Sequence, residues 1–222
     1  MAKILFVVTG HRAIDAEHPT GLWFEEASIP YDTFVRAGFE VTIASPHGGA
    51  APIDPRSLEG AAENHAARMA LEHTVTLQEA GEASEYAAIF LPGGHGTMFD
   101  LAKFQPVKTL LSEFHAQGKV VAAVCHGPAA FVDAICAGAP RMLVEGKRIT
   151  CFTDSEERAT KLDAFMPFFL ASKLREQGAT VVEGADWEDH VEIDGTWITG
   201  QNPQSSASVA SAVVNAVKAL SS

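Results

Sequence analysis

The stretch that decides the fold is Val120-Val121-Ala122-Ala123-Val124-Cys125-His126-Gly127-Pro128. Five consecutive small or β-branched apolar residues predict a strand that is buried on both faces, as in a parallel sheet. The run ends abruptly on Cys125, and Gly127 then begins a segment with helical spacing. Cys125 is therefore predicted on a tight turn between a strand and a helix.

Such a turn has a chemical consequence for its cysteine. It lifts the side chain off the sheet and directs it at the first N–H groups of the following helix, where positive potential favours thiolate over thiol. Ala123 and Gly127 are small enough for this turn, and the pattern is a cysteine version of the nucleophile elbow. The alternative on local grounds is a buried structural cysteine, because Cys packs as a small hydrophobe.

Composition limits the classes of protein that fit. With 222 residues, 47% of them hydrophobic, the chain is long enough for one α/β domain over residues 1–222, and no internal repeat or linker divides it. A net charge of −12 argues against nucleic-acid binding, which uses basic patches. No apolar run reaches membrane-spanning length, so we expect no membrane partner.

The cysteines and the N-terminus point to a compartment. Cys125, Cys136 and Cys151 show neither the paired spacing of a zinc site nor a disulfide framework, which favours a reducing, cytoplasmic location. The first residues are too few for a signal peptide and continue directly into a predicted strand at residues 3–8.

Strand and helix patterns alternate through the first half of the chain. Strands are predicted at residues 3–8, 39–44, 86–91 and 120–124, with helices marked by Phe24, Ile29, Phe34 and Val35 before Gly38 and by residues 107–115 before Gly118. This order predicts right-handed crossovers and a flavodoxin-like parallel sheet between two layers of helices.

Two other regions complete the expected architecture. Residues 46–64 are rich in Pro, Gly and Ala and are too long for an ordinary connection, which predicts a surface excursion near a site. The second half predicts a small hairpin near the C-terminus. Its remaining elements are predicted as a strand at 148–152, helix-capping residues at 153–157, a helix at 165–174, strands at 180–182, 191–193 and 197–199, and a closing helix at 205–220.

Ligands of open α/β sheets bind at the carboxyl ends of the strands, so the loops after strands one, three and four should converge. Cys125 is the candidate nucleophile there, and Gly93 and Gly94 are candidate backbone donors to an oxyanion. Glu26 lies on the helix after strand one, and Glu25 beside it competes equally on pattern alone. The glycines also fit a simple tight turn.

Two histidines accompany these residues. His126 follows Cys125 directly, and adjacency does not guarantee the hydrogen-bond reach that a catalytic base needs. His95 belongs to the glycine loop and is a candidate substrate-binding residue. Zinc ligation by His95, His126 and a carboxylate has weak support because no two candidates share an i, i+4 ligand spacing, and we assign no metal.

Four segments resemble the ThiJ/PfpI superfamily, the class I glutamine amidotransferase-like fold, over nearly the whole chain. They are Ala123-Val124-Cys125-His126-Gly127-Pro128-Ala129, Leu91-Pro92-Gly93-Gly94-His95-Gly96, Gly146-Lys147 leading to Phe152-Thr153-Asp154, and Thr199-Gly200-Gln201-Asn202-Pro203. The glycine loop, the segment at 21–26 and the excursion at 46–64 are most similar to the heat-inducible chaperone and glyoxalase III branch. That resemblance implies conversion of methylglyoxal to lactate with no glutathione, metal or other cofactor, and a homodimer.

The resemblance also implies roles for four residues. The nucleophile falls on Cys125, the carboxyl beside it on Glu26, the histidine on His126 and the third acid on Glu157, with Glu156 a near alternative. For Glu26 to act as base and acid in turn, its pKa should be raised by burial beside Trp23 or Phe24.

Two other functions use the same residues. A cysteine amidase or peptidase of the PfpI type needs the same elbow, histidine and acid, although the chain lacks the late His-Pro-Glu arrangement of true glutaminase domains. A holdase chaperone or redox sensor would use Cys125 as an oxidisable thiol instead. The extra segments of the larger bacterial chaperones have no counterpart here.

Overall fold

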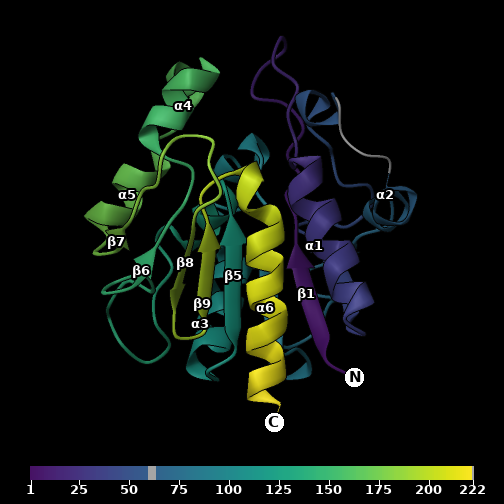
Figure 1. Ribbon diagram of the computed structural model, residues 1–222. Helices are drawn as coiled ribbons and strands as arrows, with labels where there is room; N and C mark the ends of the chain where they lie inside the picture. Colours follow the sequence, from purple (N-terminus) through teal and green to yellow (C-terminus); the bar gives the residue numbers. More distant parts are fainter. Residues whose placement is uncertain (60–63, 222) are drawn as a thin grey trace.

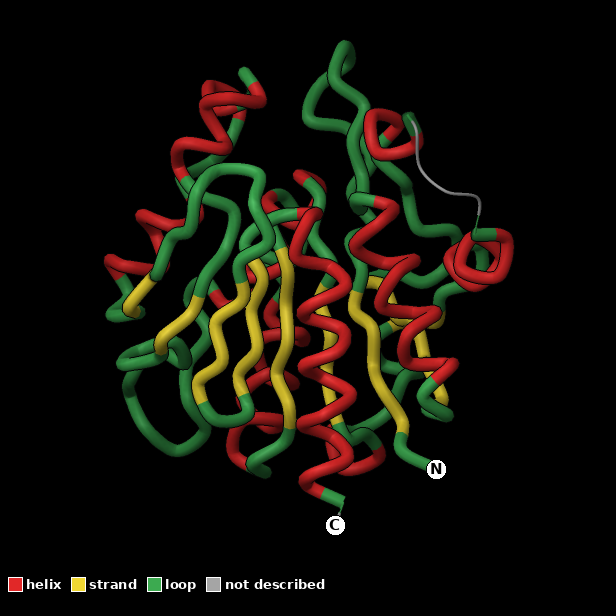
Figure 2. Tube along the Cα trace, viewed as in Figure 1, coloured by secondary structure: helices red, strands yellow, loops and turns green. Residues whose placement is uncertain are grey.

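A seven-stranded sheet forms the centre of the protein, seen in a computed structural model that describes residues 1–59 and 64–221 (Figures 1 and 2). The sheet is parallel except at one edge, where β8 runs antiparallel to β9. Its strands, in spatial order, are β3 (Val75–Thr76), β2 (Glu40–Ser45), β1 (Lys3–Val7), β4 (Ala88–Leu91), β5 (Val120–Val124), β9 (Trp197–Gly200) and β8 (Val191–Asp194). The predicted flavodoxin-like arrangement is confirmed.

Helices cover both faces of this sheet. The front layer in Figure 1 is made by α1 (Phe24–Arg36) and α6 (Ser206–Leu220), which pack against each other, and α3 (Gln105–Ala116) lies behind the sheet. Strand alternation explains the two layers, because Ile4 and Phe6 point into the core under α1 and α6 while Leu5 and Val7 point into the core under α3.

Several shorter elements lie outside the predicted pattern. The sequence did not predict α2 (His65–Leu71) or strand β3, which both follow the excursion after β2. Part of that excursion, residues 60–63, lies outside the described residues. The remaining α-helices and strands are α4 (Asp154–Thr160), α5 (Leu170–Glu176), and a separate two-stranded sheet of β6 (Arg148–Ile149) and β7 (Thr180–Val181).

Three predicted elements need correction. The helix at 165–174 begins only at Leu170, because Pro167 excludes the helical conformation from the residue before it and Met166 is extended. The strand at 148–152 shortens to β6, since Thr150 donates its N–H to the Thr199 hydroxyl instead of to a neighbouring strand. On α1, Ile29 and Val35 are exposed, so only Phe24 and Phe34 of the predicted face enter the core.

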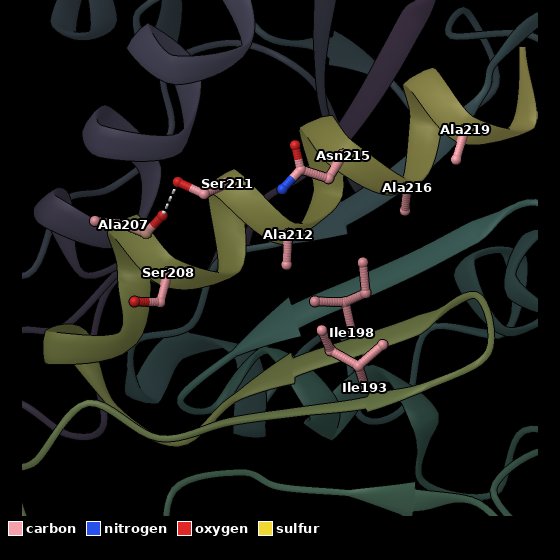
Figure 3. Close-up of a pocket in the computed structure, with 9 residues that line it drawn as sticks. All are labelled: Ile193, Ile198, Ala207, Ser208, Ser211, Ala212, Asn215, Ala216 and Ala219. Carbon is pink, nitrogen blue, oxygen red and sulfur yellow. Dashed lines mark hydrogen bonds between the residues drawn. The ribbon is translucent and has the colours of Figure 1, made fainter. Parts of the chain in front are cut away.

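A surface groove lies beside the C-terminal hairpin formed by β8 and β9. Figure 3 shows it between α6 and the hairpin, with Ile193 and Ile198 facing the small side chains of Ala212 and Ala216. In the part of the chain that the structure describes, no helix is long and apolar enough to cross a membrane.

Candidate active site

Cys125 sits on a strained turn directly after β5. Its φ is 59°, a left-handed value that costs energy for any residue with a Cβ and that recurs at functional sites. Gly127 completes the turn, because a Cβ there would lie 2.1 Å from the carbonyl oxygen of Leu91. The elbow geometry predicted from the sequence is therefore confirmed.

The predicted electrostatics of the elbow are wrong. The segment after His126 is a 3-10 helix of five residues, Gly127–Phe131, whose few aligned peptide groups give only a weak dipole to favour a thiolate. Burial raises the pKa of the Cys125 thiol well above its usual value, and the neighbouring Glu26 carboxyl raises it further. The raised pKa favours the thiol over the thiolate, so attack by Cys125 calls for a base beside it.

Glu26 is the carboxyl that the structure places against this thiol. It is fully buried in the first turns of α1, whereas Glu25 is partly exposed. The Gly93 N–H donates to Glu26 Oε2 at 2.7 Å, and Oε1 has no hydrogen-bond partner among the described residues. Burial raises the pKa of Glu26 to about 8, which agrees with the expected direction. At neutral pH this side chain is a carboxylic acid.

Gly93 and Gly94 have different hydrogen-bonding roles, although both were predicted as backbone donors to an oxyanion. Because the Gly93 N–H is occupied by Glu26, it is not free for an oxyanion. The N–H groups of Gly94 and His126 take no part in the backbone pairing of the described residues, and both residues line the cavity at Cys125. Gly94 has a φ of 103°, and a Cβ on it would lie 2.3 Å from the Gly21 carbonyl oxygen.

His126 lies alongside Cys125 in spite of their adjacency in the chain. Its Nδ1 is 3.3 Å from Sγ, and its Nε2 is 2.6 Å from Glu157 Oε2. The second bond assigns the ring proton to Nε2, because a carboxylate only accepts, and leaves Nδ1 as the base that faces the thiol. The three side chains therefore have the geometry of a Cys-His-Glu triad.

Glu157 reaches His126 because of how α4 begins. Thr153 caps the helix in a capping box with Glu156, which fixes the first turn and directs Glu157 toward the elbow. Glu156 instead accepts hydrogen bonds from Asn202 and from the Trp187 N–H. The structure thus separates the two neighbouring acids that the sequence left open.

Glu157 serves a second histidine as well. Its Oε1 is 2.8 Å from His95 Nε2, and Arg56 Nη2 is 3.2 Å from His95 Nδ1. Both ring nitrogens of His95 are therefore hydrogen-bonded within the protein. His95 was predicted to bind substrate, but neither nitrogen is free to do so in this arrangement. Although burial alone would raise the pKa of Glu157, the two imidazoles hold it well below its usual value. Burial and the neighbouring His126 lower the pKa of His95 to about 4.

These contacts bear on metal binding. Within the described residues, His95, His126 and Glu157 are a group of possible metal ligands whose ligand atoms all lie within 4.8 Å of one another. The ring nitrogens that face Glu157 are already hydrogen-bonded to its two oxygens. This bonding fits a network that orients imidazoles, and we derive no step through a metal.

The cavity above Cys125 has a volume of about 190 Å³ and is lined largely by aromatic rings. Its indole and phenyl walls come from Trp23, Phe152 and Trp187, and Trp23 Nε1 is buried with no partner among the described residues. Arg56 lines the cavity too, and it belongs to the excursion that was predicted to lie near a site. Residue patterns pointed to none of Arg56, Thr160, Trp187 or Pro203 individually.

The chain is similar in sequence to known proteins over nearly its whole length. A model of the DJ-1/PfpI family matches residues 22–216. The glutathione-independent glyoxalase HSP31 of Saccharomyces cerevisiae is 32% identical over 233 residues, covering 97% of this chain and 98% of that protein.

Two solved structures superpose on nearly the whole chain. The crystal structure of glyoxalase III from Candida albicans superposes with a TM-score of 0.89 at 28% identity and covers 97% of each chain. The Rapid Encystment Protein of 24 kDa from Francisella tularensis superposes with a TM-score of 0.92 at 29% identity, covering 98% of this chain and 99% of that one.

Proposed function

The chain belongs to the DJ-1/PfpI family, and we propose that it is a glutathione-independent glyoxalase that converts methylglyoxal to lactate through a hemithioacetal on Cys125. The observation that carries the proposal is the placement of the Cys125 thiol beside a buried carboxyl and an imidazole nitrogen. Cys125 lies beside the buried carboxyl of Glu26, and its Sγ is 3.3 Å from His126 Nδ1. Moving a proton between adjacent carbons needs one acid and one base at the same substrate.

The first step forms the covalent intermediate. His126 Nδ1 takes the thiol proton while Sγ attacks the aldehyde carbon, and the electron pair of the carbonyl bond moves to its oxygen. The N–H groups of Gly94 and His126 hold that oxygen, and Glu26 protonates it. The result is a hemithioacetal, a Glu26 carboxylate and a His126 imidazolium whose charge Glu157 stabilises.

The next steps move hydrogen from one carbon to the other. The Glu26 carboxylate removes the proton from the former aldehyde carbon, and His126 protonates the ketone oxygen to give an enediol. Glu26 then protonates the second carbon while His126 takes the hydroxyl proton, which leaves a thioester. Trp23 lines the cavity, and we assign its indole N–H, which has no partner among the described residues, as the donor to the ketone oxygen.

Hydrolysis completes the cycle without any redox change. Glu26 takes a proton from water, the hydroxide adds to the thioester carbon, and the sulfur leaves with the proton from His126. Lactate is released, and Cys125, His126 and Glu26 return to their resting protonation states. The sum is one methylglyoxal and one water for one lactic acid, so the chemistry consumes no cofactor.

The size of the cavity favours this function over peptide cleavage. A volume of about 190 Å³ enclosed by aromatic rings accommodates a small dicarbonyl. A peptidase needs an open cleft for an extended chain on both sides of the nucleophile. We further propose that one domain over residues 1–222 carries the activity, as a homodimer in the cytoplasm. Light scattering after gel filtration would show twice the chain mass of 23.6 kDa.

A direct assay tests the proposed function. Purified protein is incubated with methylglyoxal and no added thiol, and loss of the dicarbonyl and appearance of lactate are followed. Cys125→Ala should lower turnover by roughly 10³-fold or more, because it removes the covalent intermediate. Cys136→Ala, which changes a cysteine that does not line this cavity, is the matched control and should keep full activity. Full activity in Cys125→Ala would refute the mechanism.

A further inference from the structure

A second chain of contacts reaches the triad from the excursion after β2. It starts at Asp54, which is fully buried and accepts hydrogen bonds from the Thr20 hydroxyl and from the backbone N–H of Arg56. The guanidinium of Arg56 then grips the same carboxylate at two points, Nε to Oδ1 at 2.9 Å and Nη2 to Oδ2 at 2.5 Å. A bidentate pair of this kind fixes the plane of the guanidinium as well as its position.

Arg56 passes this orientation to His95. An arginine side chain has only donors, so the Nη2 contact of 3.2 Å requires His95 Nδ1 to be the acceptor. The ring proton must then sit on Nε2, where it is donated to Glu157 Oε1 at 2.8 Å. Glu157 alone favours this neutral tautomer of His95, and the contact with Arg56 reinforces it by giving the unprotonated Nδ1 a donor.

The favoured tautomer decides which oxygen of Glu157 is available to the triad. With Oε1 held by His95, Oε2 is the oxygen that faces His126 at 2.6 Å. In the other tautomer, the lone pair of His95 Nε2 would face a carboxylate oxygen, and the repulsion would turn Glu157 away. We propose that Arg56 is a positioning residue for the triad, which acts through the His95 tautomer to hold Glu157 on His126.

This proposal rests on the proposed function for its kinetic consequences only. The charged and titratable groups that face His95 are Arg56 on the excursion, Glu157 on α4 and His126 after β5, with Asp54 behind Arg56. Burial, His126 and Arg56 all favour the neutral ring, so losing Arg56 makes protonation of His95 easier. A cationic His95 would compete with the His126 imidazolium for the same carboxylate.

The primary test uses Arg56→Met in the whole chain, with Arg36→Met as the matched control because Arg36 is exposed and forms its ion pair with Asp32. Long-range proton–nitrogen NMR of the imidazoles reports the His95 tautomer directly. We expect Nε2–H in the wild type and in Arg36→Met, and a changed tautomer or a cationic ring in Arg56→Met. An unchanged His95 signal in Arg56→Met would overturn the proposal.

Kinetics separate positioning from substrate contact. A loss through Glu157 and His126 should lower kcat roughly tenfold while KM stays within about twofold, because the hydrogen bond that is lost joins Arg56 to His95 and not to the substrate. The acid limb of the pH profile should also move to higher pH. A rise in KM with kcat unchanged would mean that Arg56 binds substrate, and it would contradict the proposal.

A double-mutant cycle protects the test against misfolding of the single variant. In His95→Gln, the amide of glutamine can donate to Glu157 without help from Arg56, so Arg56→Met should cost little more in that background. An equal loss of kcat in both backgrounds would refute the relay. If the wild type fails to turn over methylglyoxal, the proposed function fails, while the NMR experiment still decides the tautomer.

Discussion

Two buried carboxyl groups lie near Cys125, and at neutral pH one is a neutral acid while the other is a negatively charged carboxylate. Glu26 approaches from α1 and Glu157 from α4, and both side chains are almost completely excluded from solvent. Burial raises the pKa of Glu26 to about 8, whereas the pKa of Glu157 is held well below its usual value. Burial alone therefore does not decide the charge of an acid in this protein.

The difference lies in the hydrogen-bond partners. Glu26 receives one backbone N–H, from Gly93, which does not compensate for lost hydration of a carboxylate. Glu157 receives an imidazole N–H on each oxygen, which does. One side of the nucleophile thus supplies an acid, and the other supplies a fixed negative charge.

Of the substitutions that test this difference between Glu26 and Glu157, Glu26→Gln should have the largest effect on activity. Glutamine copies the shape of the protonated acid and can still accept from Gly93, but it cannot transfer a proton. Because two proton transfers to and from carbon are assigned to Glu26, we expect kcat to fall roughly 10³-fold. Steady-state assays with methylglyoxal measure this, and a thermal melt checks the fold. Activity within tenfold of wild type would assign the proton transfers to another group.

Glu157→Gln comes next, because Glu157 acts on the reacting atoms only through His126. Its amide oxygen can accept one imidazole N–H, while its NH₂ group would face the other, so one histidine must change tautomer or rotate. We expect kcat to fall roughly 10²-fold to 10³-fold with KM little changed. If Glu157→Gln lost less than threefold, the triad geometry would not be the source of the base.

Parts of this site were predictable from the sequence, and the reasons are local. The apolar run before Cys125 and the small residues beside it predicted the elbow, because strand burial and turn sterics depend on neighbours in the chain. Glu26 and Glu157 were assigned by family resemblance, and pattern alone did not separate them from Glu25 and Glu156. Helical spacing does not record which side chain meets a residue from another element.

The errors also have physical causes. The thiolate prediction relied on the first N–H groups of a helix after the elbow, and the segment there is a 3-10 helix of only five residues, Gly127–Phe131. Gly93 was assigned to the oxyanion because it follows a strand, although its N–H is bonded to Glu26. Arg56 was missed as an individual residue because its contact with His95 joins positions 39 residues apart. Such long-range contacts follow from the strand order, which sequence periodicity does not determine.

The pH dependence of activity sharpens the comparison further. The cycle begins with Glu26 as a carboxylic acid, so kcat/KM should fall as pH rises through about 8, by a factor approaching ten per pH unit above it. The Glu157 carboxylate adds no limb in this range because its pKa is low. A pH profile of kcat/KM tests this, and a steady rise from pH 7 to pH 10 would indicate an ordinary free thiol instead.

Glu26 and Glu157 should have opposite effects on how the free energy of unfolding changes with pH. Between its unfolded value of 4.5 and about 8, Glu26 binds a proton in the folded state only, so its contribution to the free energy of unfolding declines as pH rises through this window. The contribution of Glu157 is complete above 4.5 and is lost as pH falls below it. The free energy of unfolding, measured by urea titration at pH values from 5 to 9, should decline less with pH in Glu26→Gln than in wild type. Identical slopes of this free energy against pH would contradict the raised pKa of Glu26.

Trp23→Phe should have the smallest effect, and it tests the Glu26 side without altering either carboxyl. Trp23 immediately precedes α1 and lines the cavity, and its indole N–H has no partner among the described residues. Phenylalanine keeps an aromatic wall but removes the donor, so losing one neutral hydrogen bond to the ketone oxygen should lower kcat/KM by about 2-fold to 12-fold. The alkaline limb should stay near pH 8, because Glu26 keeps its burial and its bond to Gly93. A limb that moved with this substitution would mean that Trp23 acts on Glu26, and unchanged kcat/KM would leave the ketone oxygen to another donor.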